Sequence, residues 1–509
     1  MIDMIDMIDT TDSAGPSRHA IFSRRVLTPE GTRPAAVVIE DERIVEVIEV
    51  SETENLPEAL PEALHGRMLD LGELTLMPGL VDCHVHINQP GRTHWEGFHT
   101  ATRAAAAGGV TTLVDMPLNC LPVTTTVAGF ERKLADTPGE LWVDLGFWGG
   151  VIPGNADQLG PLAARGVLGC KAFLCDSGIE EFPASDEAVL REAMTALAAA
   201  GLPLLAHAEI ELETPAGPTT SIDPRDYHSW LDQRPPAWEE AAIDLLIALC
   251  RETGCAVHIV HLSAASAVPA LRRARAEGLP ITVETCPHYL CLSAEEIPAG
   301  ATQFKCAPPV REAENREALW DALREGVIDL VVTDHSPCTP ELKSPEAGDF
   351  LEAWGGIASL SLGFSSVWTQ ACARGFSLAE VSRWMSSAPA RIAGLDRGGQ
   401  RSGEASSAEP EPAEGSTRGP SPRGRKGRIA PGFDADLVAL DPDAEFTVRA
   451  DALHFRHRIS PWIGRRLRGV VHGTWLRGRR IFDASAPVDA CFCMPTGTGR
   501  PLLGRAHGL

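Results

Sequence analysis

The strongest constraint on the fold comes from residues 77–86, which read Met-Pro-Gly-Leu-Val-Asp-Cys-His-Val-His. Residues 80–87 have the apolar character of a short buried strand, and side chains two positions apart on a strand point to the same side. His84 and His86 therefore direct two imidazoles toward one point, which is half of a metal site. A histidine pair in a polar turn is the alternative, and it is disfavoured only because further ligand types recur downstream.

The downstream sequence alternates short β-type runs with alanine- and glutamate-rich stretches. Residues 100–107 and 186–197 are rich in strong helix formers and predict helices. Strands are predicted at residues 80–86, 110–115, 142–147, 169–173, 203–207, 256–261, 281–285 and 330–334. Eight strands in this alternation predict an α/β fold, a (β/α)8 TIM-type barrel over residues 77–396. A doubly wound open sheet is the main alternative, but it would not gather ligands from five separate strands around one point.

The two ends of the chain are predicted to form a second, smaller domain. Residues 19–76 contain short strands and turns, and residues 428–483 again have strand character, so together they predict a small β-sandwich domain. Residues 397–427 are dominated by Gly, Ser, Pro, Glu and Arg and predict a disordered insertion. Residues 1–18 are expected to be a disordered N-terminus, and residues 484–509 a C-terminal tail without an assigned role.

Composition excludes several classes of partner. A formal charge of −24 over 509 residues argues against binding to nucleic acid or an anionic membrane, because both need basic patches. No apolar run is long enough to cross a bilayer. Residues 1–9 lack the features of a signal peptide, so the thirteen cysteines predict reduced, mostly buried thiols without disulfides in a cytoplasmic protein.

Six candidate metal ligands lie at or near the carboxyl ends of the predicted strands, the face where barrel enzymes build their active sites. They are His84, His86, Lys171, His207, His261 and Asp334. Neutral imidazoles and a carboxylate suit two divalent ions, with zinc as the default. Six such groups would converge from separate strands only by coincidence if their role were structural.

Lys171 needs chemistry of its own, because an ammonium has no lone pair to offer a metal. A lysine buried on a strand loses its proton readily, and its amine can take up carbon dioxide to give a carbamate, N6-carboxylysine, whose two oxygens bridge the ions. Two ions roughly 3.5–4 Å apart activate a water and polarise a carbonyl. Asp334 is expected to bind one ion and to carry the proton from the attacking water to a leaving nitrogen, which predicts amide hydrolysis.

These motifs resemble the cyclic amidohydrolases of the amidohydrolase superfamily, which include dihydroorotases, hydantoinases and allantoinases. The resemblance covers about residues 79–395 and is carried by residues 78–86, Lys171-Ala-Phe, His207-Ala-Glu, His261-Leu-Ser, Glu284-Thr-Cys-Pro-His-Tyr-Leu and Asp334-His-Ser-Pro. It implies that one zinc is held by His84, His86, carbamylated Lys171 and Asp334. The other is then held by Lys171, His207 and His261.

Within this family the chain is most similar to allantoinases, through residues 87–98, 111–119 and 304–311. Asn88 stands where dihydroorotases usually carry an arginine, and Asp176 where hydantoinases usually carry a tyrosine. The resemblance implies hydrolysis of the hydantoin ring of allantoin to allantoate in purine catabolism. A hydantoinase or dihydropyrimidinase is the alternative within the enzyme class, and dihydroorotase comes third. A non-catalytic scaffold that keeps the fold is disfavoured, because every expected ligand is present.

Several other residues are assigned less directly. Asn88, Cys306 and Ser336 are expected to line the pocket for a small cyclic ureide. His288 and His335 are expected either to orient a ligand or to serve the fold. His258 is expected to face away from the site, because it lies three residues before His261 on the same predicted strand. Relatives are often tetramers, so the resemblance implies a homo-oligomer with a tetramer favoured.

Overall fold

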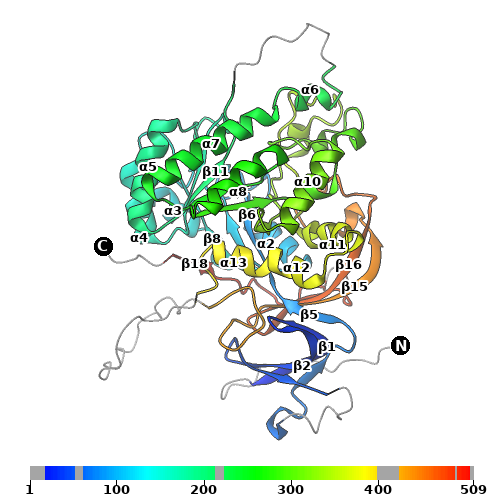
Figure 1. Cartoon of the computed structure of the whole chain (residues 1–509). Coiled ribbons are helices and arrows are strands. Elements are labelled where there is room, and N and C mark those ends of the chain that lie inside the picture. Colours follow the sequence, from blue (N-terminus) through cyan, green and yellow to red (C-terminus); the bar gives the residue numbers. More distant parts are fainter. Residues whose placement is uncertain (1–17, 52–60, 213–222, 398–423, 488–489, 505–509) are drawn as a thin grey trace, which may run out of the picture.

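The computed structural model describes residues 18–51, 61–212, 223–397, 424–487 and 490–504. Of the predicted disordered segments, residues 1–17 and 398–423 lie outside these described residues. Residues 424–427, which the sequence assigned to the insertion, are described, and Lys426 among them is buried against the barrel. The described part consists of a barrel surrounded by helices and a sheet that lies against one end and one side of it (Figure 1).

The barrel contains every strand that the sequence predicted, most of them shorter at their ends. Its strands are β6 (Leu80–Val85), β7 (Val110–Asp115), β8 (Asp144–Phe147), β9 (Gly149–Gly150), β10 (Cys170–Phe173), β11 (Leu204–His207), β12 (Val257–Ile259), β13 (Ile281–Thr285) and β14 (Leu330–Val331). All neighbouring strands pair in parallel, in two sets. The first set has the order β6-β7-β8, and the second has the order β9-β10-β11-β12-β13-β14. Only Trp148 separates β8 from β9, so these two segments act as one interrupted strand that joins the two halves.

The barrel closes between β6 and the segment after β14. Val85 forms a parallel bridge with His335, and the His86 amide donates to the His335 carbonyl at 2.8 Å. Asp82 on β6 accepts hydrogen bonds from the hydroxyl of Thr333 at 2.5 Å and from its amide at 3.2 Å. Burial raises the pKa of Asp82 to about 7, while the Thr333 hydrogen bonds oppose that shift. This seam brings residues 82–86 next to residues 333–335.

Helices cover the outside of the barrel (Figure 1). The longer ones are α2 (Phe98–Ala107), α3 (Val127–Leu134), α4 (Ala156–Arg165), α5 (Glu187–Ala200), α7 (Pro236–Thr253), α8 (Val268–Ala276), α10 (Ala313–Arg324) and α11 (Gly363–Ala373). Short helices are α6 (His228–Leu231), α9 (Pro287–Cys291), α12 (Leu378–Ser382) and α13 (Ala388–Ile392). The predicted helix at 186–197 is α5, which begins where the Asp186 side chain accepts from the Val189 amide at 2.9 Å.

Both chain ends build the second sheet, as the sequence predicted. Its strands are β1 (His19–Thr28), β2 (Gly31–Glu40), β3 (Arg43–Glu49), β4 (Met68–Asp70), β5 (Thr75–Pro78), β15 (Leu437–Thr447), β16 (Arg466–Leu476) and β17 (Arg479–Asp483). The two ends meet where β5 pairs antiparallel with β15. Because β5 leads directly into β6, this sheet also anchors the strand that carries His84 and His86.

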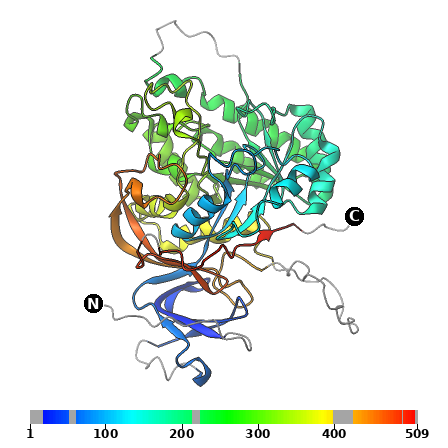
Figure 2. The ribbon, with the colours of Figure 1, turned by 180° about the vertical axis from the view of Figure 1, so that it is seen from behind.

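The C-terminal residues, for which the sequence predicted no role, are packed on the barrel. Strand β18 (Pro501–Leu502) pairs in parallel with β8, and the Gly499 amide donates to the Leu141 carbonyl at 2.7 Å. Figure 2 shows this segment running along the base of the barrel. Short strands without apolar alternation carry almost no signal in the sequence, which explains the omission.

All thirteen cysteines lie within the described residues, and no disulfide joins any two of them there. Eleven of them are buried, which agrees with the prediction of mostly buried thiols. Among the helices of the described residues, none is both long and apolar enough to span a membrane.

Lys426 joins the two domains through a buried cluster of charges. Its ammonium lies 2.6 Å from Asp144 on β8, 2.9 Å from Asp434 and 2.7 Å from Asp436. Arg477 also pairs with Asp144, so two cations offset three carboxylates. All five side chains are 7% exposed or less, which makes the loss of any one cation expensive.

Replacing Lys426 with methionine is therefore expected to lower the free energy of unfolding by about 3–5 kcal/mol, because buried carboxylates lose their counter-charge. Urea unfolding followed by circular dichroism measures this change. Arg428→Met is the matched control, since Arg428 is exposed two residues away and its loss should cost less than about 0.5 kcal/mol. Equal midpoints for K426M and R428M would contradict the assigned role.

Candidate metal centre

The barrel brings the six predicted ligand residues to one place at the carboxyl ends of its strands. His84 comes from β6, Lys171 from β10 and His207 from β11, whereas His86, His261 and Asp334 directly follow β6, β12 and β14. All six side chains are buried. The structure therefore brings together every ligand candidate that the sequence indicated.

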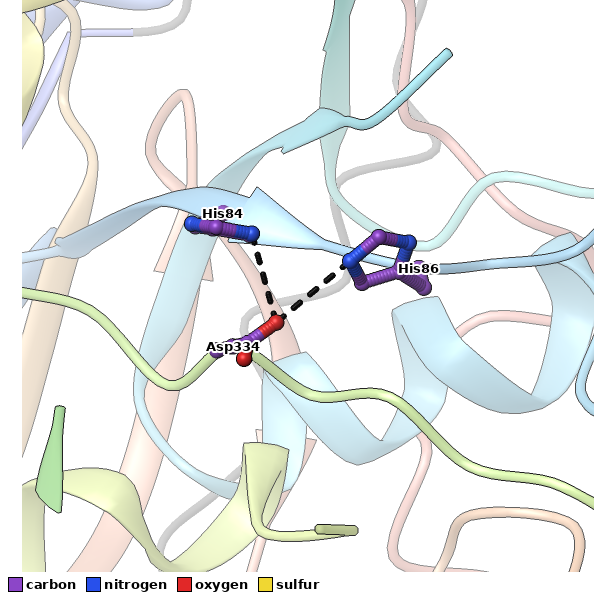
Figure 3. A group of neighbouring side chains, drawn as sticks. All are labelled: His84, His86 and Asp334. Carbon is purple, nitrogen blue, oxygen red and sulfur yellow. Dashed lines mark ion pairs between the residues drawn. The ribbon is translucent and has the colours of Figure 1, made fainter. Parts of the chain in front are cut away.

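The first half of the centre consists of His84, His86 and Asp334. The Asp334 Oδ1 atom lies 3.2 Å from His84 Nε2 and 3.4 Å from His86 Nε2, as the dashed lines in Figure 3 show. The His84 ring projects from β6 and the His86 ring from the segment just after it, and both face the carboxylate (Figure 3). One ligand atom from each of the three residues lies within 4.8 Å of the others, a spacing suited to a single cation.

The second half consists of Lys171, His207 and His261. His207 Nδ1 lies 3.1 Å from His261 Nε2, so these two ring nitrogens face a common point. The Lys171 ammonium lies 5.1 Å from the centre of the Phe173 ring. The His84 and His261 rings are 5.3 Å apart and connect the two halves.

Among the described residues, Lys171 Nζ and His261 Nδ1 are buried without a hydrogen-bond partner, and His84 Nε2 has only its ion-pair contact with Asp334. Buried polar atoms in folded proteins are almost always satisfied, so a group of orphans indicates a ligand that completes them. Neutral imidazole nitrogens and a carboxylate are the donors that zinc-like ions take. The residues present therefore fit divalent metal, and Lys171 fits once its amine carries a group with lone pairs.

The electrostatics keep these groups in the forms that such a centre needs. Burial lowers the pKa of His86 and His207, and it lowers the pKa of His261 well below the usual value, so all three favour neutral imidazole. Burial also lowers the pKa of Lys171 to about 8, although nearby carboxylates oppose the shift. For Asp334 burial is outweighed by His84 and His86, and its pKa lies well below the ordinary value.

Glu284 on β13 orients a ligand and was not identified as a site residue from the sequence. Its Oε1 bonds to His84 Nδ1, and its Oε2 lies 2.9 Å from His258 Nε2. Burial opposes ionisation of Glu284, but His84 and His258 outweigh it and lower its pKa to about 2. A carboxylate on the far ring nitrogen fixes the tautomer of a metal-binding histidine.

The prediction that His258 faces away from the site is wrong. Strand β12 ends at Ile259, and His261 adopts a left-handed backbone with φ of 39°, so strand alternation does not extend from His258 to His261. His258 consequently points into the barrel beneath the ligands, where it contacts Glu284.

Two further polar side chains contact the ligands from behind. Glu209 Oε2 lies 2.6 Å from His207 Nε2, and Asn119 Nδ2 lies 3.4 Å from His86 Nδ1. Glu209 follows His207 by two residues, so its position in the His-Ala-Glu motif was the signal that could have identified it. Asn119 follows β7 at a left-handed turn, which the sequence did not mark as part of the site.

His288 and His335, which the sequence left open, have different environments. The His335 ring contacts Glu96 at 3.2 Å and accepts from the Ser359 amide at 3.2 Å, so it anchors a loop. Both ring nitrogens of His288 are buried without a hydrogen-bond partner, close to Cys286 and Asp334. Of these two histidines, therefore, His288 is the one whose ring nitrogens have no hydrogen-bond partner among the described residues.

The three predicted substrate contacts are buried, and two of them, Asn88 and Ser336, lie two residues after a ligand candidate in the sequence. The Asn88 amide group donates to the Pro337 carbonyl at 3.2 Å and leaves its Oδ1 without a partner. The Cys306 carbonyl accepts from Trp230 Nε1 at 3.0 Å, and the Ser336 amide donates to the Ile357 carbonyl at 3.0 Å. An open cavity of about 610 Å³ is lined instead by residues that follow Lys171 and His207, among them Cys175, Asp176, Ile210 and Glu211.

The chain is similar to a known protein family and to individual members of it. Residues 75–400 match the model of the amidohydrolase family. The chain is 47% identical over 475 residues to an allantoinase of Streptomyces avermitilis, covering 93% of this chain and 96% of the relative. It is 42% identical over 476 residues to an allantoinase of Saccharomyces cerevisiae, covering 92% and 96%.

Among solved structures, the chain is similar to the L-hydantoinase (dihydropyrimidinase) of Arthrobacter aurescens. The TM-score is 0.79 at 26% sequence identity, and the match covers 95% of this chain and 99% of that one. The barrel and the sheet made from both chain ends are thus shared over nearly the full length.

Glu284→Gln is expected to weaken divalent-metal binding by about 10–100-fold, because the amide cannot hold the His84 and His258 rings as the carboxylate does. Titration of the metal-free protein with cobalt measures the change. Glu277→Gln is the control, since Glu277 is 49% exposed on the outer surface. Unchanged cobalt affinity in E284Q would exclude an orienting role for Glu284.

Proposed function

Because this chain belongs to the amidohydrolase family, we propose that it hydrolyses the hydantoin-ring amide of allantoin to give allantoate. The observation that carries this proposal is the 47% identity to an allantoinase over 93% of the chain, together with the convergence of six ligand-type side chains. Hydrolysis of a cyclic amide uses the neutral imidazoles and the ionised carboxylate found at this face of the barrel.

A hydantoinase or dihydropyrimidinase is the second candidate, supported by the fold shared with the Arthrobacter enzyme. The lower identity of that match, 26%, favours allantoin. Asn88 and Asp176 support the same choice. A buried amide can hydrogen-bond a neutral ureide, and an aspartate stands where hydantoinases usually carry a tyrosine.

The proposed metal site contains two divalent ions, zinc by default. His84, His86, Lys171 and Asp334 would hold one ion, and Lys171, His207 and His261 the other. When bound, such a pair polarises a carbonyl and acidifies a water molecule. Lys171 would join both sites as N6-carboxylysine, formed when its neutral amine adds to carbon dioxide and releases one proton. The buried Nζ without a partner and the lowered Lys171 pKa of about 8 support this modification.

Asp334 would move the proton in this reaction. Its carboxylate faces the His84 and His86 rings and is held ionised, which is the form that can accept the proton of the attacking water. It would then donate that proton to the ring nitrogen as the C–N bond breaks, so that the nitrogen leaves as an uncharged amide group. Asn88, Cys306 and Ser336 would position the ring through amide, backbone and hydroxyl groups.

We propose a homotetramer, as the resemblance to cyclic amidohydrolases implies. We also propose a cytoplasmic location, because thirteen cysteines without disulfides suit a reducing compartment. The only partner this function requires is a small cyclic ureide.

Lys171→Ala is expected to lose most bound metal and activity, because no group remains to bridge the two sites. Adding a short carboxylic acid such as propionate should restore part of both, since its carboxylate can occupy the space of the carbamate. Metal content by mass spectrometry and turnover are measured on the same sample. Lys171→Arg keeps the charge but cannot be carbamylated, and full activity of either variant without added acid would refute the carbamate.

The substrate assignment is tested by ring-opening rates for allantoin, dihydrouracil, hydantoin and dihydroorotate with the metal-loaded protein. We expect allantoin to be opened at least about tenfold faster than the others, a difference of about 1.4 kcal/mol in transition-state stabilisation. A faster rate with another ring would overturn the substrate and leave the metal chemistry intact. No reaction with any ring while two metals are bound would contradict the enzymatic proposal.

A further inference from the structure

Arg234 lies directly behind the ligand candidate His207. Its Nη1 donates to Glu209 Oε2 at 2.6 Å, and the same oxygen lies 2.6 Å from His207 Nε2. The Glu209 side chain is fully buried and that of Arg234 is 14% exposed, so water screens this chain of contacts little. Arg234 therefore acts on His207 through a single shared carboxylate oxygen.

This contact decides which nitrogen His207 offers to the centre. An imidazole that donates its Nε2 proton to a carboxylate keeps its lone pair on Nδ1. His207 Nδ1 is the atom that faces His261 Nε2 at 3.1 Å. The Phe173 ring stacks on the imidazole at 4.5 Å and limits its rotation. Glu209, held by Arg234, thus sets both the tautomer and the orientation of His207.

The same side chains form a second possible cation site. Cys175, His207 and Glu209 are buried, and one ligand atom from each lies within 4.8 Å of the others. A thiol, an imidazole and a carboxylate are a donor set that zinc accepts. Glu209 Oε1 has no hydrogen-bond partner in the part of the chain that the structure describes, and Cys175 lines the open cavity, so an ion from solvent has a route to this group.

A third ion there would damage the proposed centre. It would need the Nε2 lone pair of His207, which is available only if His207 gives up its proton or turns its other nitrogen away from the metal pair. The Arg234 guanidinium already supplies positive charge to Glu209, and like charge at this distance opposes a divalent ion. Arg234 is also held in place between the rings of Trp230 and Trp238, at 4.8 and 5.6 Å from their centres.

We propose that Arg234 is a positioning residue with two effects: it fixes His207 as an Nδ1 ligand, and it keeps a third metal ion out of the group formed by Cys175, His207 and Glu209. This inference rests on the proposed metal centre. It adds a residue outside the ligand set that governs how many ions the chain holds.

Cobalt titration of the metal-free full-length chain tests the proposal without using substrate. Wild type should bind two cobalt ions per chain and show no thiolate-to-cobalt charge-transfer band, because Cys175 stays unligated. Arg234→Met should bind the first two ions about 10–100-fold more weakly, as expected when the group behind a metal-binding histidine is lost. It should also bind a third ion with a thiolate-to-cobalt band.

Three variants make the readout specific. R234M/C175S should lose the band and the third ion while keeping the weakened binding of the first two. Arg234→Lys keeps a positive charge near Glu209 and should show no band, so it remains informative if R234M fails to fold. Arg251→Met is the matched control on α7, since Arg251 is 52% exposed, and it should titrate as wild type does.

The outcomes separate this inference from the proposed function. Wild-type affinity in R234M would overturn the positioning role, and weakened affinity without a thiolate band would overturn the exclusion of a third ion. A band in wild type would also overturn that exclusion. If wild type binds no cobalt at all, the proposed metal centre itself is wrong.

Discussion

The seam that closes the barrel between β6 and the segment after β14 is the contact on which the site depends. His84 and His86 precede Asp334 by about 250 residues, and only this closure brings them within 3.4 Å of its carboxylate. Buried hydrogen bonds from Thr333 to Asp82 stabilise the seam next to the ligands. Because the same strand carries the seam and the two imidazoles, loss of barrel closure would separate the first half of the centre.

Buried charged side chains behind the ligands hold the ligand histidines in the orientations that a metal site needs. Burial alone favours neutral imidazole but leaves ring orientation undetermined. Glu284 behind His84 and Glu209 behind His207 supply that orientation, and each also contacts a second polar side chain, His258 or Arg234. A buried carboxylate without a partner would lower the stability of the fold by several kcal/mol. His258 and Arg234 are therefore needed to keep the Glu284 and Glu209 carboxylates in the interior. Burial and pairing together create the electrostatics that metal chemistry requires.

Within the described residues, the chain ends pack against the barrel and contribute none of the six ligand candidates. Strand β5 pairs with β15 and continues into β6, while Lys426 and Arg477 neutralise Asp144 on β8. The C-terminal strand β18 adds a backbone ladder to the same β8. These contacts attach three distant parts of the sequence to the barrel halves that carry the ligands, so the second domain supports the geometry of the centre from a distance.

The sequence by itself determined the strand positions, the barrel class and the six ligand candidates. These follow from local rules: side chains alternate along a strand, apolar runs recur with helical stretches between them, and parallel strands present their carboxyl ends at one face. Only the tertiary structure decided what lies behind the ligands. Glu284, Arg234, the inward position of His258 and the packing of β18 depend on contacts between segments far apart in the sequence, and on where a strand ends, as at Ile259. Local pattern carries no information about such pairings, because a buried carboxylate or arginine acquires its role only from the group the fold places against it.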